Sequence, residues 1–429
     1  MERGLRAFIE FLAGVLHEIL SKRISLDLAF KTMLKRYGKL PAGVTPKTLY
    51  EAARSITLNY YTLRFMERRV FGAEGGTRRL VKLWLIYIAD PSRLPHRLEE
   101  PVERLRRKFM KTWRRRAPAS LDEVLEELPT VTDKISVRYS YPRWMVELLL
   151  RLAPREWVER LLEELNRERW WIRVNTLKTD VDRIVRELEE AGVVVEQDKD
   201  LPYMLRVVDY REPLHHLDAM WRGDIVFQDK ASAMVVEALQ PSEGDVVLDM
   251  TGAPGVKASL VMQLTENKAR IILADLSLER LKRAKRLLRL YGVDESRIDI
   301  VNTDSMRFKP RIKPSKILLD APCSSTGTIG KDPAVKLHLS DQAWAARFPR
   351  IQLGLARNAS AIKAPTIYSV CSILPWEGEE IIESIDAEPI EPKVPGSTGY
   401  TTYSVSGKVR RFFPHIHGTQ GFFIAGFRG

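Results

Sequence analysis

The fold is decided by the stretch Asp249-Met250-Thr251-Gly252-Ala253-Pro254-Gly255-Val256-Lys257. It follows the apolar run of residues 245–249, which predicts a short buried strand. It precedes residues 258–264, which predict a helix. A strand, a Gly/Pro turn and a helix form the opening of an open α/β sheet, and such sheets bind nucleotide-like ligands at the carboxyl ends of their strands.

The turn differs from the dinucleotide-binding pattern G-x-G-x-x-G, which brings the backbone against a pyrophosphate. Its glycines are Gly252 and Gly255, and Pro254 between them has no N–H and a fixed φ. Because fewer donors face an anion, a ligand with a cationic end and no phosphate fits better. S-adenosylmethionine is such a ligand, and Asp249 supplies a carboxylate for its amino-acid moiety. An ordinary strand-to-helix turn is the alternative.

The composition predicts a basic protein of several domains. At 429 residues, the chain is expected to hold two or three domains. Its formal net charge of +13 favours nucleic acid as a partner, against a solvated cationic surface or the charge-rich surface of a thermophilic protein. Two cysteines exclude a disulfide-built secreted scaffold. Since neither a signal-peptide pattern nor an apolar stretch of membrane-spanning length occurs, we expect a cytoplasmic protein.

The first 130 residues are predicted to form an all-helical domain. Apolar residues recur at helical spacing over 5–20, 26–34, 49–68 and 78–88, which indicates a small bundle that binds or assembles. The Ser120 and Glu123 pair has the spacing of a capping box at the start of a further helix. Eight basic residues form either a solvated helix face or a phosphate-binding linker: Arg104, Arg106, Arg107, Lys108, Lys111, Arg114, Arg115 and Arg116.

Residues 131–225 are predicted to form a small α+β domain. Helices are expected over 143–152, 156–166 and 180–191, and strands over 170–175, 193–196 and 204–208. Arg173 and Asn175 are polar residues on an otherwise apolar strand. They reach a ligand across the domain junction or lie on an exposed strand face.

Residues 226–429 alternate between strands and helices, which predicts a doubly wound α/β domain. Strands are expected over 246–249, 270–275, 299–301, 316–320 and 366–369, with a closing β-hairpin within 410–427. Successive strands end in Asp249, Asp275, Asp304 and Asp320. Asp275 suits a ribose diol and Asp304 an adenine amino group, whereas a helix-capping role is the commoner explanation for any one of them.

The two cysteines, Cys323 and Cys371, both fall just past predicted strands. A free cysteine is usually an inert core residue. However, a thiolate can add to C6 of a pyrimidine and thereby make C5 nucleophilic enough to accept a methyl group from a sulfonium. A second group must then remove the C5 proton so that the adduct can eliminate.

Several motifs resemble those of the Sun-type RNA (cytosine-C5)-methyltransferases. They lie at residues 228–232, 248–257, 320–328, 368–372 and 421–425, and residues 173–178 resemble the family's substrate-side segment. The likeness covers roughly residues 140–429. The N-terminal region is more weakly similar to the NusB-like helical domain that precedes some members, including the bacterial small-subunit rRNA enzyme.

The resemblance implies a role for each matching residue. Cys371 would be the nucleophile at C6, Cys323 would help to release the product, and Asp320 would hydrogen-bond the cytosine close to the cofactor. In DNA cytosine methyltransferases the Pro-Cys thiol is the nucleophile, so this assignment depends on the family. The implied cofactor-binding residues are Thr251, Gly252, Ala253, Pro254, Gly255, Val256, Lys257, Asp275, Arg280, Asp304 and Asp320.

The chain departs from the family pattern at four places. Val256 replaces the second glycine of Ala-Pro-Gly-Gly-Lys, Thr251-Gly252 stands for Cys-Ala or Ala-Ala, Val370 replaces Thr, and Gly378 replaces Asn. These changes affect the fine geometry of cofactor binding but remove no group that the chemistry requires.

We therefore expect a monomeric, metal-independent RNA methyltransferase that makes 5-methylcytosine from S-adenosylmethionine. Ribosomal RNA is favoured as its substrate over tRNA, and the target cytosine should be unpaired or flipped out. The alternative is a non-catalytic RNA-binding or ribosome-assembly factor that retains the fold. A nicotinamide dehydrogenase is disfavoured by the absence of the phosphate-binding pattern.

Overall fold

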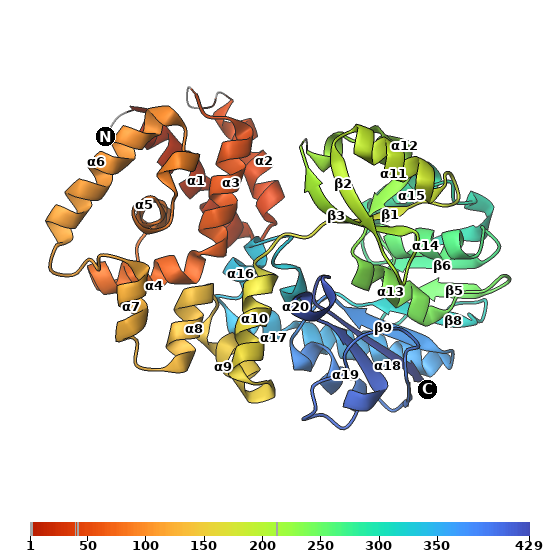
Figure 1. The fold of residues 1–429 in the computed structure, drawn as a ribbon. Coiled ribbons are helices and arrows are strands. Elements are labelled where there is room, and N and C mark those ends of the chain that lie inside the picture. The colour runs from red at the N-terminus through yellow and green to blue at the C-terminus, as the bar shows by residue number, and fades with distance from the viewer. Residues whose placement is uncertain (1–2, 39, 41–42, 212) are drawn as a thin grey trace. The chain divides into compact units, whose positions relative to one another are not determined.

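The computed structural model describes residues 1–429 except 1–2, 39, 41–42 and 212. The chain forms two compact units (Figure 1). One comprises Met1–Arg167 and Thr328–Ala345, and the other comprises Glu168–Gly327 and Ala346–Gly429. No helix in the described ranges is long and apolar enough to cross a membrane.

The first unit is helical, as expected. The central helix α1 buries one face, including Phe8, Leu12 and Leu16, and packs against α2, α3, α5 and α6. The stretch predicted over 49–68 is divided into two helices at Asn59, whose side chain donates to the Ser55 carbonyl at 2.8 Å and so ends the first. The helices are α1 Arg3–Lys22, α2 Leu26–Tyr37, α3 Pro46–Leu58, α4 Tyr60–Phe71, α5 Thr77–Tyr87, α6 His96–Trp113, α7 Leu121–Glu127, α8 Val131–Tyr139, α9 Arg143–Leu152 and α10 Arg155–Leu165.

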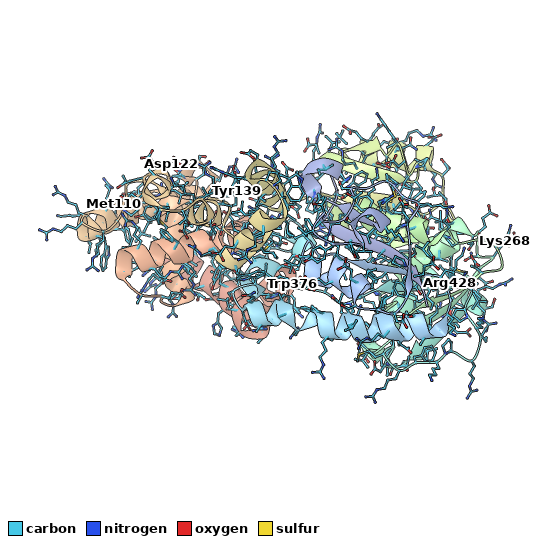
Figure 2. The ribbon with its side chains drawn as sticks, turned by 90° about the horizontal axis from the view of Figure 1, so that it is seen from below. Met110, Asp122, Tyr139, Lys268, Trp376 and Arg428 are labelled. Carbon is cyan, nitrogen blue, oxygen red and sulfur yellow. The ribbon has the colours of Figure 1, made fainter. Side chains whose placement is uncertain are left out.

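Two local features of this unit concern the predicted basic stretch. The capping box is confirmed, because Ser120 accepts from the Glu123 N–H at 3.2 Å and Glu123 accepts from the Ala119 N–H at 2.6 Å. Arg106 has a structural role, since its guanidinium donates to the carbonyls of Leu85 and Ala89. Figure 2 labels Met110 of α6, which lies within this stretch, and Asp122 of α7, which follows it.

Residues 328–345, which include α16 Ala334–His338, complete the helical unit. The Lys336 side chain is fully buried, and its ammonium donates to the carbonyls of Leu58 at 2.8 Å and Tyr139 at 2.9 Å. It also lies 3.9 Å from the centre of the Tyr141 ring. Burial without a carboxylate holds the Lys336 pKa well below its usual value. The segment that follows the Cys323 motif is thus anchored among helices distant from it in sequence.

The second unit contains a small antiparallel sheet of order β2-β3-β1-β4. Its strands are β1 Trp171–Val174, β2 Val193–Gln197, β3 Met204–Tyr210 and β4 Ile225–Phe227, with α11 Val181–Glu190 beside them. The expectation of an exposed strand face for Arg173 and Asn175 is wrong, because both are buried. Arg173 donates to the Ser259 hydroxyl at 2.6 Å, and Asn175 donates to the carbonyls of Gly223 and Tyr291. They join the small sheet to the larger domain.

The main sheet has the order β10-β12-β9-β8-β5-β6-β7, and β11 pairs with β12. Strands β9, β8, β5, β6 and β7 are parallel, whereas β12 runs antiparallel to β9. This confirms the doubly wound α/β domain and the closing hairpin. The strands are β5 Val246–Asp249, β6 Arg270–Asp275, β7 Ile298–Asn302, β8 Lys316–Asp320, β9 Thr366–Val370, β10 Glu388–Ile390, β11 Val409–Phe412 and β12 Phe422–Arg428.

Helices cover both faces of this sheet. The core on one face includes residues of α13 Lys230–Leu239, α14 Val256–Leu264 and α15 Leu278–Leu290. The core on the other includes residues of α18 Phe348–Ile362 and α19 Glu379–Glu383. Chain order reverses between β5 and β8, so the crevice at their carboxyl ends is the expected ligand site.

Candidate active site

The turn after β5 is a tight loop that requires glycine at two positions. A Cβ at Gly252 would lie 2.2 Å from Cδ1 of Leu273, and Gly255 has a φ of +94°. The Gly252 N–H donates to the Ala274 carbonyl at 2.9 Å, which ties the turn to β6. Val256, where the resembling family has a second glycine, begins α14 without a positive φ, so its backbone does not require glycine.

Two acids lie buried at the ends of β5 and β6. Asp249 is 2 % exposed, and burial together with the nearby charge of Asp320 raises its pKa to about 7. Asp275 accepts from the Ser277 N–H at 2.9 Å and from the Ala253 N–H at 3.3 Å. Arg280 lies 3.3 Å from Asp275 and also donates to the Ala253 carbonyl. The structure therefore brings the turn, Asp275 and Arg280 together.

The third acid, Asp304, lies in the turn after β7. Its carboxylate accepts from the Met306 N–H at 3.0 Å, which is the short-range turn contact expected for an aspartate after a strand. Its neighbours tie it to the same edge of the sheet. The Thr303 N–H donates to the Asp275 carbonyl at 3.1 Å, and the Ser305 hydroxyl donates to the Met250 carbonyl at 2.5 Å.

The fourth acid, Asp320, is accessible, with 34 % of its side chain exposed. Lys257 donates to one carboxylate oxygen at 2.6 Å, and the Ser369 hydroxyl donates to the other at 2.7 Å. Thr251 donates to the Asp320 carbonyl at 2.8 Å. Asp320 is therefore oriented from three neighbouring segments, and it remains able to accept a further hydrogen bond from a ligand.

The two cysteines lie together at the ends of β8 and β9. Their sulfur atoms are 3.3 Å apart, both thiols are free, and both residues are partly exposed. The hydrogen bond between them lowers the pKa of Cys371 and, with burial, raises the pKa of Cys323 well above its usual value. The Ser325 hydroxyl, 3.6 Å from the Cys371 sulfur, also lowers the pKa of Cys371. Cys371 is therefore the more acidic thiol of the pair.

Behind the thiols lies a buried carboxylate that the sequence analysis did not identify. Glu377 is fully buried and accepts from the Ser324 N–H at 2.8 Å and from the hydroxyls of Ser324 and Ser372 at 2.5 Å each. Ser324 follows Cys323, and Ser372 follows Cys371. One carboxylate therefore holds both cysteine loops. Its burial raises the pKa of Glu377 despite these bonds.

Two further residues brace the same loops. The Gln352 amide, from α18, donates to the Pro322 carbonyl at 2.9 Å and to Glu377 at 3.2 Å. Arg411, from β11, forms a fully buried ion pair with Glu379 and donates to the Ser372 carbonyl at 3.3 Å. Its guanidinium also lies 4.3 Å from the centre of the Tyr400 ring. The loop after Cys371 is thus held from α18 and from the closing hairpin.

These residues carry only a weak sequence signal. Glu377 and Glu379 stand in an acidic segment typical of a solvated helix start, and Gln352 lies on an amphipathic helix. Arg411 stands beside Arg410 in the strand β11, and nothing in the sequence Val-Arg-Arg-Phe indicates which of the two arginines is buried.

Two family models match the chain. The model described as the 16S rRNA methyltransferase RsmB/F matches residues 236–428, and the RsmF/B-like ferredoxin-like domain matches residues 141–211. The chain is 31 % identical over 325 residues to a mouse 28S rRNA (cytosine-C(5))-methyltransferase. That alignment covers 71 % of the chain but only 40 % of the relative, so the chain spans well under half of that protein's length.

Two other comparisons extend over nearly the whole chain. Ribosomal RNA small subunit methyltransferase B of Escherichia coli is 23 % identical over 419 residues, which cover 93 % of this chain and 94 % of the relative. The crystal structure of PH0851 superposes with a TM-score of 0.77 over 99 % of this chain and 98 % of that one, at 23 % identity, and shows the same fold. The two family models together match more than half of the chain, and they show that it belongs to the RsmB/F family of methyltransferases.

Proposed function

We propose that the protein transfers a methyl group from S-adenosylmethionine to C5 of a cytosine in RNA. The observation that carries the proposal is the pair of free thiols, 3.3 Å apart, beside the partly exposed Asp320. Methyl transfer to oxygen or nitrogen has no use for two thiols at this place. The names of the relatives, which specify cytosine C5 in rRNA, support the same chemistry.

The turn and the strand-end acids fit the cofactor. Pro254 removes a backbone donor from the turn, and the buried carboxylates of Asp249 and Asp275 lie beside it, so the site suits an ammonium and a ribose rather than a phosphate. Thr251 to Lys257 would surround the methionine end. Asp275, with Arg280 beside it, would hold the ribose, and Asp304 would accept from the adenine amino group. When bound, the cofactor supplies an electrophilic methyl group.

The thiols have complementary roles in the proposed reaction. The Cys371 sulfur forms a bond to C6 of cytosine, and the electron pair of the C5–C6 double bond is displaced so that C5 becomes nucleophilic. Asp320 accepts from the cytosine amino group and orients the ring. After C5 is methylated, a base removes the C5 proton, the C6–S bond breaks and the Cys371 thiolate returns. Cys323, 3.3 Å from that sulfur, assists this release.

The substrate class and domain roles are part of the proposal. We favour rRNA over tRNA, because the relatives with the longest matches are named for ribosomal RNA. The target base must leave any helical stack to reach the thiols.

We retain the division into three domains, residues 1–130, 131–225 and 226–429. The family match over residues 236–428 supports the last of them. We also propose a monomer, which light scattering after gel filtration would test.

Incubation with labelled S-adenosylmethionine is expected to transfer the label to RNA. Ribosomal RNA and tRNA from cells that lack the protein should be assayed separately, and the nucleosides identified after digestion. We expect label in 5-methylcytosine from rRNA. Label in another nucleoside would contradict the chemistry, label in tRNA alone would change the substrate, and RNA binding without transfer to any RNA would favour a non-catalytic factor.

Cofactor affinity is expected to depend on the ionisation of Asp249. Its pKa is raised to about 7, so the carboxyl is neutral below that pH and charged above it. An ionised Asp249 attracts the ammonium of the cofactor, so affinity for S-adenosylhomocysteine should rise severalfold between about pH 6 and pH 8. Calorimetry at each pH would measure this affinity. The Asp249→Asn variant should bind S-adenosylhomocysteine weakly and with the same affinity at every pH. An affinity that rises with pH in this variant as it does in the wild type would contradict the role given to Asp249.

A further inference from the structure

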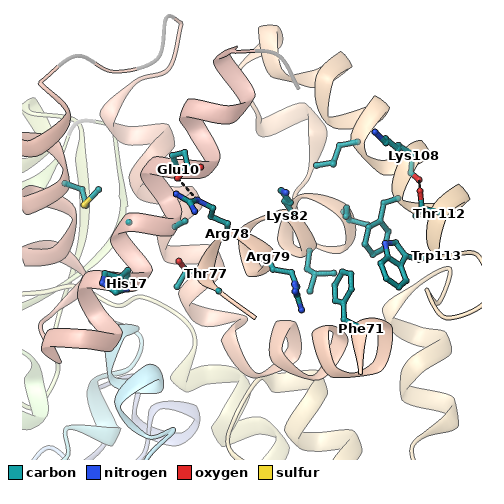
Figure 3. A pocket seen from close by; sticks show the side chains of 18 of the residues that line it. Glu10, His17, Phe71, Thr77, Arg78, Arg79, Lys82, Lys108, Thr112 and Trp113 are labelled. Atoms are coloured by element: carbon teal, nitrogen blue, oxygen red, sulfur yellow. Dashed lines mark hydrogen bonds and ion pairs between the residues drawn. The ribbon is translucent and has the colours of Figure 1, made fainter. Parts of the chain in front are cut away.

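We propose that a cavity in the helical unit binds single-stranded RNA at a site separate from the catalytic centre. The cavity has a volume of about 870 Å³ and is lined by residues of α1, α2, α4, α5 and α6 together with the α4–α5 loop. Figure 3 shows Glu10 and His17 of α1 on one side of it and Lys108, Thr112 and Trp113 of α6 on the other. Its size is within the range of pockets that hold organic ligands.

The lining is strongly cationic. Arg36, Arg78, Arg79, Lys82 and Lys108 line the cavity, and Glu10 is the one carboxylate among the lining residues. That carboxylate is already paired with Arg78 at 2.6 Å. The cavity therefore has an excess of positive charge, which suits a ligand that carries several negative charges.

Two of these cations have no partner within the described part of the chain. Arg36 is paired with Glu18 at 3.1 Å, and Arg79 lies 3.7 Å from Glu67. In contrast, the ammonium groups of Lys82 and Lys108 form no ion pair or hydrogen bond with any described residue. They come from facing helices, α5 and α6, and are available to two phosphates of one strand.

The same cavity offers aromatic surfaces. Phe71 and Trp113 meet edge to face with ring centres 4.8 Å apart, and Phe109 lies 6.2 Å from Phe71. All three rings are only partly buried. The Arg79 guanidinium lies 4.5 Å from the centre of the Phe71 ring, which extends this surface by a flat cationic group. Rings and guanidinium planes next to phosphate-binding lysines are the combination on which unpaired bases stack.

This combination distinguishes single-stranded RNA from other polyanions. A duplex keeps its base faces stacked inside, so it could use the lysines but not the rings. A peptide of acidic residues alone, such as polyglutamate, could pair with the lysines but has no ring to stack on Trp113. The site also gives a role to Lys108, which is the one residue of the predicted basic stretch that lines the cavity. The inference is independent of methyl transfer, since it concerns binding in a different unit of the chain.

The test uses the full chain and a short fluorescent oligoribonucleotide of uridines, followed by anisotropy over a series of salt concentrations. The double variant Lys82→Gln/Lys108→Gln is expected to bind about tenfold more weakly or worse at low salt. Its slope of log affinity against log salt should fall by about 1.4, because each phosphate of a single strand that a lysine no longer neutralises lowers the slope by roughly 0.7. Trp113→Leu should weaken binding without a change in slope, because stacking releases no counterions.

The matched control is Lys31→Gln/Lys47→Gln, which removes the same charge from exposed positions of this unit that do not line the cavity. It should bind within about twofold of the wild type. An equal loss of RNA affinity in both double variants would mean that the RNA is attracted by the net charge of the surface, and it would overturn the proposal. Wild-type affinity in Lys82→Gln/Lys108→Gln and in Trp113→Leu would overturn it as well. Equal competition by a polyglutamate peptide would also overturn it in favour of an acidic protein partner. A thermal melt of each variant checks that it folds.

Discussion

Cys371→Ala is expected to lower the rate of methyl transfer to RNA by about four orders of magnitude or more, the scale of loss when a covalent nucleophile is removed. The contact with Cys323 lowers the pKa of Cys371, so Cys371 is the thiol we expect to form the bond to C6. Binding of S-adenosylhomocysteine should be unchanged, because the strand-end acids remain. The measurement is single-turnover transfer of labelled methyl with calorimetry of cofactor binding in parallel. Wild-type transfer by this variant would refute the assignment.

Cys323→Ala is the matched contrast, since it removes the neighbouring thiol and leaves Cys371 in place. Addition at C6 and methylation of C5 should proceed, but release of the product should be slow. A covalent protein–RNA adduct is therefore expected on denaturing gels from Cys323→Ala and from neither Cys371→Ala nor the double variant. If the adduct forms instead from Cys371→Ala, the roles of the two cysteines are reversed.

Glu377→Ala is expected to produce the second large effect, a loss of about 10- to 100-fold in the methylation rate together with about 2–4 kcal/mol of stability. The substitution leaves the Ser324 N–H and the hydroxyls of Ser324 and Ser372 buried without their acceptor. Both cysteine loops lose their common support, so the sulfur atoms no longer keep their spacing. The rate is measured by single-turnover transfer and the stability by urea unfolding.

Thiol reactivity separates this positioning role from a general loss of stability. The charge of Glu377 contributes to the raised pKa of Cys323, after the hydrogen bond to Cys371 and burial. The pH profile of alkylation at each cysteine, followed by peptide mass spectrometry, should therefore change in Glu377→Ala and in the more conservative Glu377→Gln. Glu380→Ala is the control, because Glu380 is exposed and pairs only with the Tyr403 hydroxyl among described partners. An unchanged profile in Glu377→Ala would leave Glu377 with a structural role alone.

The alternation of apolar runs with Gly/Pro turns was sufficient to predict the five parallel strands and the position of the ligand turn. Strands β5, β6, β8 and β9 each bury three to five residues, most of them apolar, and apolar character is a local property that can be read along the chain. Cys323 and Cys371 were predicted to lie at strand ends, and the parallel pairing of β8 with β9 brings those ends together. The likeness to the family then supplied roles that the residue types alone left open.

Other features depend on contacts between segments far apart in the sequence. Arg173 looked like a residue of an exposed strand face, but the tertiary structure buries it against α14, where Ser259 accepts its hydrogen bond. Lys336 has the same sequence signal as any helix-surface lysine, yet helices from the first part of the chain enclose it. The cavity in the helical unit likewise exists only because five amphipathic helices, α1, α2, α4, α5 and α6, pack around it.

By itself, the sequence determined the α/β sheet, the turn after β5 and the presence of two thiols at the sheet's edge, because local periodicity and residue type encode burial and chemistry. Only the tertiary structure decided which thiol is the more acidic and what holds the pair. A pKa depends on groups within a few ångströms, and these come from β8, β9 and the segment of Glu377. Such distances are set when the loops close on one another, so no pattern along the chain contains them.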